Sequence, residues 1–259
     1  MGRKPSKGCA LNTRSLSLIA VALVVGARMG FALPPQFNTQ EFKLAVQEVR
    51  PMAKAAELMA QKYGIRITYE DLPLIEYSQL QKPGIISISL PSPRSVPPPR
   101  PIDIVQLVLD NYAKNGNPGV FRVKENDGAF QIIPAMIIDS RGRALEAVPI
   151  LDAHISFPSY ERNGFDTLQT IANAVSLSAG IKVNFGLAPY KWLMQQKLTI
   201  GANNEVARDV LLRALDSTGA KLIWWLLYDP HNRSYGLSID AAMVEEKTPT
   251  GRTRLRRLP

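Results

Sequence analysis

Few side chains in this sequence have the type and spacing that catalysis requires. The two histidines, His154 and His231, lie far apart, and neither stands at metal-ligand spacing from a carboxylate. The sequence has no glycine-rich phosphate loop, no zinc-binding helix motif and no Gly-x-Ser-x-Gly nucleophile elbow. Each histidine is therefore interpreted as an ordinary strand or turn residue. We predict that the protein is not an enzyme and that it binds no metal and no cofactor.

Asp110 and Asp216 are the two carboxylates whose positions invite comparison. Each follows a leucine near the end of a predicted helix, and a pair of carboxylates can do acid–base chemistry. The two residues stand, however, at equivalent points of two similar segments. We interpret them as recurring because the segment recurs, and not as partners in one site.

The segments around these aspartates are two copies of one unit. In the first copy a periodic apolar helix ends at Gly64 and runs into a strand, and in the second a helix ends at Gly180 and does the same. Both copies continue with an alternating strand, a second helix and a hairpin. Self-similarity on this scale indicates a duplicated unit of domain size. The pattern predicts an α+β fold of two tandem small βαββαβ-like units, each with two helices packed on a small mixed sheet.

The predicted boundaries follow from changes in composition. The first unit spans 33–136 and the second spans 150–244, with a linker over 137–149. A proline-rich insertion at 91–101 interrupts the first unit. Such a segment is either a polyproline II ligand for an aromatic groove or a surface loop that keeps a spacing, and we favour the loop.

The first 32 residues have the layout of a secretory signal peptide. Basic residues up to Arg14 precede an uncharged apolar run over 15–27, and Ala32 supplies a small residue for cleavage. Arg28 directly after the run favours a retained anchor as the alternative. We predict cleavage near Ala32, so that the mature chain begins near Leu33 and is periplasmic or secreted.

The single cysteine, Cys9, lies before the apolar run. Cleavage near Ala32 would leave a mature protein without cysteine. The mature chain would then have no disulfide, no thiolate metal site and no cysteine nucleophile.

The net charge of +9 is concentrated at the two ends of the chain, and residues 33–246 are close to neutral. A nucleic-acid-binding domain carries its positive charge on the fold itself, so we predict no nucleic-acid partner. The segment 245–259 is predicted to be a basic disordered tail. It would make at most weak contact with an acidic membrane surface, through Arg252, Arg254, Arg256 and Arg257.

The last hairpin of the second unit is apolar on both faces. Alternation places Trp224 and Tyr228 on one face and Trp225 and Leu227 on the other. Either a partner covers the second face, or the two units pack on each other there with Trp225 between them; alternation leaves open which tryptophan is in the core. Aromatic residues concentrate binding energy at interfaces, and an open sheet edge can accept a strand. The candidate protein-interaction residues are Trp224, Trp225, Leu227, Tyr228 and Tyr235.

The second unit has a strand at 181–185 after Gly180, a strand at 197–200, and a second helix that ends Leu215-Asp216-Ser217-Thr218-Gly219. In these features it resembles the secretin and TonB short N-terminal (STN) domain. The resemblance covers about 155–239, and the first unit matches more loosely, without the Thr-Gly pair. The resemblance implies a small periplasmic module that docks onto another envelope protein, such as a secretin or a TonB-system component.

Together these features predict a non-catalytic, exported protein-interaction module of the bacterial cell envelope. The alternative is an envelope small-ligand binder or enzyme with a pocket between the two units.

Overall fold

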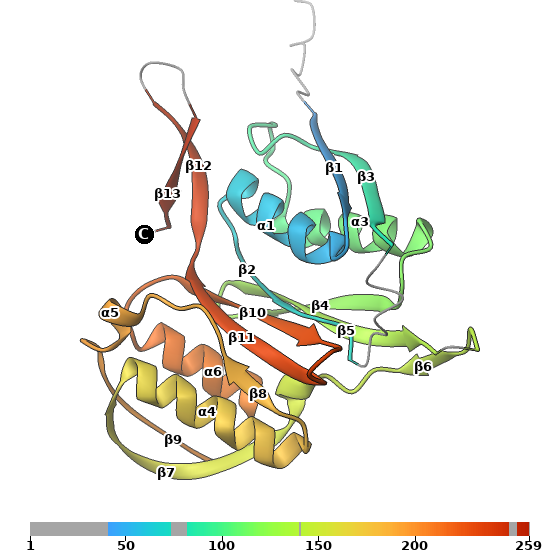
Figure 1. The fold of residues 1–259 in the computed structure, drawn as a ribbon. Coiled ribbons are helices and arrows are strands. Elements are labelled where there is room, and N and C mark those ends of the chain that lie inside the picture. Colours follow the sequence, from blue (N-terminus) through green and yellow to red (C-terminus); the bar gives the residue numbers. More distant parts are fainter. Residues whose placement is uncertain (1–40, 74–81, 140, 249–252, 259) are drawn as a thin grey trace, which may run out of the picture. The chain divides into compact units, whose positions relative to one another are not determined.

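The computed structural model describes residues 41–73, 82–139, 141–248 and 253–258 (Figure 1). The predicted signal peptide, with its cleavage point near Ala32, lies outside the described residues. In the first half of the chain, strands and helices alternate in the order β-α-β-β-α-β-β. The elements are β1 (Phe42–Glu48), α1 (Pro51–Tyr63), β2 (Arg66–Glu70), β3 (Gly84–Leu90), α3 (Pro101–Lys114), β4 (Val120–Asn126) and β5 (Ala129–Ile138).

The second half repeats this order, with two short helices added. Its elements are η1 (Ile150–Asp152), β7 (His154–Asn163), α4 (Gly164–Ala179), β8 (Val183–Phe185), α5 (Tyr190–Leu193), β9 (Lys197–Val206), α6 (Ala207–Asp216), β10 (Leu222–Asp229) and β11 (Ser234–Ala241). The predicted α+β class is confirmed. Below, the first repeat means β1 to β5 and the second repeat means η1 to β11.

The strand pairing is also the same in the two repeats. β1 pairs antiparallel with β3, as β7 does with β9. β4 and β5 form an antiparallel hairpin, as do β10 and β11, and β2 lies parallel to β5 as β8 lies parallel to β11. Each repeat therefore has a two-stranded sheet and a three-stranded sheet, and its two helices contact both.

Glycine ends the first helix of each repeat. Gly64 after α1 and Gly180 after α4 are in the left-handed region, with φ of 64° and 67°. Only glycine adopts this conformation without steric cost, and it turns the chain from the helix straight into the next strand. These two residues also gave the repeat its clearest mark in the sequence.

The two three-stranded sheets join into one through β2 and β10. The strand order is β4-β5-β2-β10-β11-β8, with β6 (Ala144–Glu146) paired to the end of β5. β2 and β10 are parallel, with Tyr69 opposite Trp225 and Glu70 opposite Leu226. This junction, called the joint below, differs from the prediction of two units separated by a linker over 137–149. The predicted linker contains the end of β5 and the strand β6.

The helices of the two repeats lie on opposite faces of this sheet (Figure 1). Tyr69 and Trp225 are paired, so their side chains share a face, and Tyr69 contacts Phe121, whose ring packs on Tyr112 of α3. The neighbouring pair, Glu70 and Leu226, faces the other way, toward α6. The second repeat is thus turned over relative to the first.

The C-terminal segment forms a hairpin, which corrects the prediction of a disordered tail over 245–259. β12 (Met243–Lys247) pairs antiparallel with β13 (Thr253–Arg257), and β12 contacts α1. Arg254 and Arg256 lie near Glu246 across the hairpin, at N–O distances of 2.8 and 3.7 Å. The sequence had shown only an excess of basic charge, because this partner becomes adjacent only in the paired register. Arg252 lies outside the described residues.

Candidate functional site

The joint is held by two consecutive carboxylates at the end of β2. Glu70 and Asp71 have exposed fractions of 1% and 2%, and they point to opposite sides of the sheet. A buried carboxylate is costly unless charged or polar groups surround it. Each of the two has such a set of partners, and each set brings together residues from both repeats.

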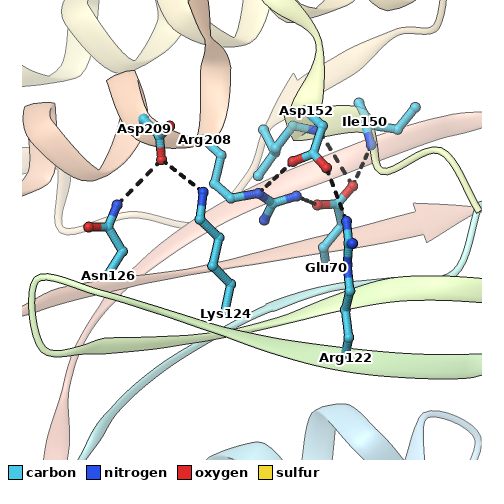
Figure 2. A network of polar contacts seen from close by, with 9 residues as sticks. Glu70, Arg122, Lys124, Asn126, Ile150, Asp152, Arg208 and Asp209 are labelled. Atoms are coloured by element: carbon cyan, nitrogen blue, oxygen red, sulfur yellow. Dashed lines mark hydrogen bonds and ion pairs between the residues drawn. The ribbon is translucent and has the colours of Figure 1, made fainter.

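Glu70 lies toward α6 of the second repeat (Figure 2). Its Oε2 accepts a hydrogen bond from Nη2 of Arg208, which is itself buried, and its Oε1 accepts from the backbone N–H groups of Ile150 and Leu151. Burial raises the pKa of Glu70, while the Arg208 charge and these donors oppose the rise. Arg208 also donates from Nε to Asp152 at 2.9 Å.

Asp71 binds groups on the side of α1. It accepts from Nε of Arg50 at 2.7 Å, from the Tyr69 hydroxyl at 2.8 Å and from the backbone N–H of Tyr228 at 3.2 Å. Burial, together with the Asp71 charge, raises the pKa of Tyr69 well above its usual value. The Arg50 side chain further donates to the carbonyl of Tyr228. Both faces of the joint are therefore closed by polar contacts.

The outer face of the first hairpin, the face turned away from α1 and α3, meets the second repeat through charged residues (Figure 2). Arg122 lies 3.7 Å from Asp152, and Lys124 lies 3.5 Å from Asp209 at the start of α6. Asn126 also donates to Asp209, at 3.4 Å. These contacts are long and partly exposed, so each contributes little to stability.

The outer face of the second hairpin is different, because it forms the floor of a groove. The floor is made by Ile223, Trp225 and Leu227 of β10 with the end of β11, and α1 forms the wall. The groove has a volume of about 560 Å³. It lies between the two repeats, since α1 belongs to the first and β10 to the second. We call it the α1–β10 groove.

Charged residues border this apolar floor. Lys54 and Glu57 of α1 form an ion pair at 2.7 Å, and Gln61 donates to the other oxygen of Glu57 at 3.1 Å. Asp240, near the end of β11, is exposed and also lines the groove. An apolar floor with a polar border is the general form of a protein or ligand binding surface.

The structure separates the five predicted interaction residues into two groups. Trp224, Tyr228 and Tyr235 are buried, with exposed fractions of 0%, 4% and 1%, and are not available to a partner. Trp225 and Leu227 are half-buried and line the groove. Trp224 is thus the core member of the pair. Trp225 also contacts Tyr69 of the first repeat, with ring centroids 6.2 Å apart. It therefore lies between the repeats, as in the alternative in which the two units pack on each other there.

The other predicted features are placed apart from the groove. Nδ1 of His154 lies 2.8 Å from the carbonyl of Asn204 on the exposed strand pair β7–β9, and His231 lies in the exposed turn after β10. Asp216 pairs with Arg66 at 2.5 Å, whereas Asp110 accepts from Gln106 on the exposed side of α3. The two aspartates are not brought together.

The sequence also suggested an open edge on the last hairpin, and the structure corrects this. β10 is paired with β2 and β11 with β8, so neither strand of the hairpin has a free edge. Sequence reasoning missed Glu70, Asp71 and Arg208 altogether. Adjacent acids at the end of a strand were the available signal, but nothing nearby in the sequence shows that they are buried.

Within the described part of the chain, no group of three His, Cys, Asp or Glu side chains stands close enough to hold a metal ion. No helix among the described residues has the length and apolar character needed to cross a membrane. In comparisons with known proteins, no family model, no curated protein and no solved structure matches this chain.

Proposed function

We propose that this chain is a non-catalytic, exported protein-interaction module of the bacterial cell envelope, and that the α1–β10 groove receives its partner. One observation carries the proposal: Trp225 and Leu227 stay partly exposed on a strand whose opposite face is fully buried. Indole and aliphatic surface gains free energy when it leaves water. A partner side chain that fills the groove would complete that burial.

The chemistry of the groove favours a polypeptide segment with an apolar anchor residue and polar flanks. Trp225 supplies the kind of rigid aromatic surface on which binding energy concentrates. Lys54, Glu57 and Asp240 at the border present both signs of charge to the flanks of such a segment. The resemblance to STN domains makes an envelope component, such as a secretin or a TonB-system protein, the kind of partner that we propose.

Site-specific photo-crosslinking in cells that produce the protein tests this proposal. A photoreactive residue at Leu227 should trap one defined partner, and the crosslink should disappear when Trp225→Ala is added. The matched control places the photoreactive residue at Val148, which is 76% exposed but distant in sequence from the groove. The same adducts from both positions, or none from position 227, would argue against the groove as the docking site.

A second candidate function has its own support, because the groove lies between the repeats and its volume falls within the roughly 300–1,000 Å³ of small-ligand sites. In this alternative the protein binds a small envelope molecule. A thermal-shift screen with cell-wall fragments and metabolites distinguishes the two. A compound that raises the melting temperature of the wild type, but not of Trp225→Ala, would favour the ligand-binding function.

The proposed export depends on residues 1–32, and intact-mass measurement of the exported protein tests it. The expected mass is that of a chain beginning near Leu33. A mass that retains Cys9 would exclude cleavage.

A further inference from the structure

The joint between the repeats provides a template for contact between chains. At the joint the edge of β2 pairs in parallel with the edge of β10, over Tyr69 and Glu70. The N–H of Asp71 extends the pairing by donating to the carbonyl of Leu226 at 2.8 Å. Beside the strands, Arg66 reaches Asp216 at the end of α6.

Each strand of the joint has an equivalent in the other repeat. Gly64 and Gly180 begin β2 and β8 alike, and β2 pairs with β5 as β8 pairs with β11. The hairpin registers likewise make β4 the equivalent of β10. Four residues of the joint thus have counterparts. Phe185 corresponds to Tyr69, Lys182 to Arg66, Arg122 to Trp225 and Asp110 to Asp216.

These counterpart strands are the two ends of the sheet. Among the described strands, β8 pairs only with β11 and β4 pairs only with β5. Within one chain the edge of β2 therefore pairs with the edge of β10. The equivalent edges, those of β8 and β4, remain unpaired among the described strands.

Strand direction permits the two remaining edges to meet. β4 is antiparallel to β5, β5 and β2 are parallel to β10, and β10 is antiparallel to β11, which is parallel to β8. β4 and β8 consequently run in the same direction. A second copy in the same orientation presents β4 parallel to β8, which is the arrangement at the joint.

The surface around β8 has the features of an uncovered joint. The two most exposed large apolar side chains of the described residues, Leu177 and Leu187, flank this strand, with exposed fractions of 87% and 82%. A hollow beside β8 is lined by Gln169, Asn173, Ser176 and Leu177 of α4. Their counterparts on α1 are Ala53, Glu57, Ala60 and Gln61, which form the wall of the α1–β10 groove. Among the described residues, the hollow in front of this face of α4 is lined on its other side only by Lys182 and the edge strand β8.

The charges on the two edges are complementary. Lys182 is exposed beside β8, and Asp110 is exposed on α3 beside β4, in the positions that Arg66 and Asp216 hold at the joint. Phe185 would meet the guanidinium of Arg122, where the joint has the rings of Tyr69 and Trp225. The N–H of Val183 donates to the hydroxyl of Ser176. Val183 precedes the residues of β8 that would pair with β4, so this hydrogen bond does not compete with that pairing.

We propose that the chain self-associates head to tail, with the β8 edge of one copy paired in parallel with the β4 edge of the next. The occupant of each edge is a second copy of this chain. Because the two surfaces of the contact differ, it is heterologous, and it produces either a closed ring or an open filament. Lys182 of one copy pairs with Asp110 of the next.

Charge reversal at the two edges tests this arrangement in the purified full chain. Sedimentation measured over a range of concentrations should show that the average mass of the wild type rises with concentration. Lys182→Glu and Asp110→Lys should each raise the Kd for association by about tenfold. An equimolar mixture of the two variants should associate more strongly than either variant alone, because each contact between unlike variants joins either two original or two reversed charges, whereas each contact within one variant joins like charges.

Lys191→Glu is the matched control, since it makes the same charge change at an exposed lysine outside the edges. It should associate like the wild type, and circular dichroism should show that all variants keep the fold. A wild type that stays at the monomer mass throughout the concentration range would overturn the proposal. So would a mixture that remains as dissociated as its components, or a control that weakens association equally.

Discussion

The outer faces of the two hairpins occupy equivalent positions in the repeat but carry opposite chemistry. The first presents Arg122 and Lys124, and the second presents Trp225 and Leu227 at the same register positions. The first face meets Asp152 and Asp209 of the second repeat, whereas the second face lies in the α1–β10 groove. The duplicated fold thus places a polar contact on one side of the sheet and an apolar binding surface on the other.

This difference shows how a duplication can divide roles between its copies. The inner faces of both hairpins stay apolar, since Phe121, which packs on Tyr112 of α3, and Trp224 are both buried in the core. Only the outer faces diverged in character. Fold stability therefore depends on the inner positions, and the proposed function depends on the outer positions of the second copy alone.

The largest expected effect separates the two faces of β10. Trp224→Ala should lower the free energy of unfolding by about 3–5 kcal/mol, because it leaves a cavity in the core. Trp225→Ala should cost only about 1 kcal/mol, since its side chain is half-buried. Urea denaturation of both variants measures the contrast. Equal losses would show that the outer face is as much a part of the core as the inner face.

The next contrast compares the glycines that end the equivalent helices. Gly180→Ala should cost about 1–2 kcal/mol for the left-handed backbone alone, because a Cβ there meets nothing within 4 Å. At Gly64 the Cβ would lie 2.9 Å from Cγ2 of Val244, so Gly64→Ala should cost roughly 1 kcal/mol more. Addition of Val244→Ala to Gly64→Ala should remove that excess. If it does not, β12 does not pack against the end of α1.

Glu70→Gln addresses the joint itself. The change keeps the shape of the side chain but weakens its hydrogen bonds to Arg208, and we expect a loss of about 1.5–3 kcal/mol. Glu205→Gln is the control, because Glu205 near the end of β9 pairs with Arg213 of α6 in an exposed setting, where a loss of at most about 1 kcal/mol is expected. Thermal unfolding of the two variants side by side gives the answer. A joint of minor importance would make the two losses equal.

The smallest effect is expected on the polar outer face of the first hairpin. Lys124→Ala removes a partly exposed pair with Asp209 and should cost about 0–1 kcal/mol, and this cost should vanish at high salt. Unfolding measured at low and high ionic strength tests the point. A large loss of stability that salt does not alter would mean that the outer face of the first hairpin is as buried as the inner face of β10.

Features set by neighbouring residues could be predicted from the sequence, whereas contacts between residues far apart in the chain could not. Gly64 and Gly180 each end a helix within their own segment, and alternation divides Trp224 from Trp225, so the repeat and the two faces of β10 were predictable. The pairing of β2 with β10 depends on groups that meet only after both repeats have folded. Glu70 therefore looked like an ordinary charged strand end, and Arg254 looked like part of a basic tail.

The joint also sets a delay during synthesis of the chain. Arg66 on β2 and Leu222 at the start of β10 are 156 residues apart, so at ~5–20 residues per second the edge of β2 waits ~8–30 s for its partner strand. An unpaired strand edge invites wrong pairing, and charged side chains on the edge discourage it. Arg66 and Glu70 are such charges. The residues that close the finished joint would thus also protect the nascent first repeat until the second arrives.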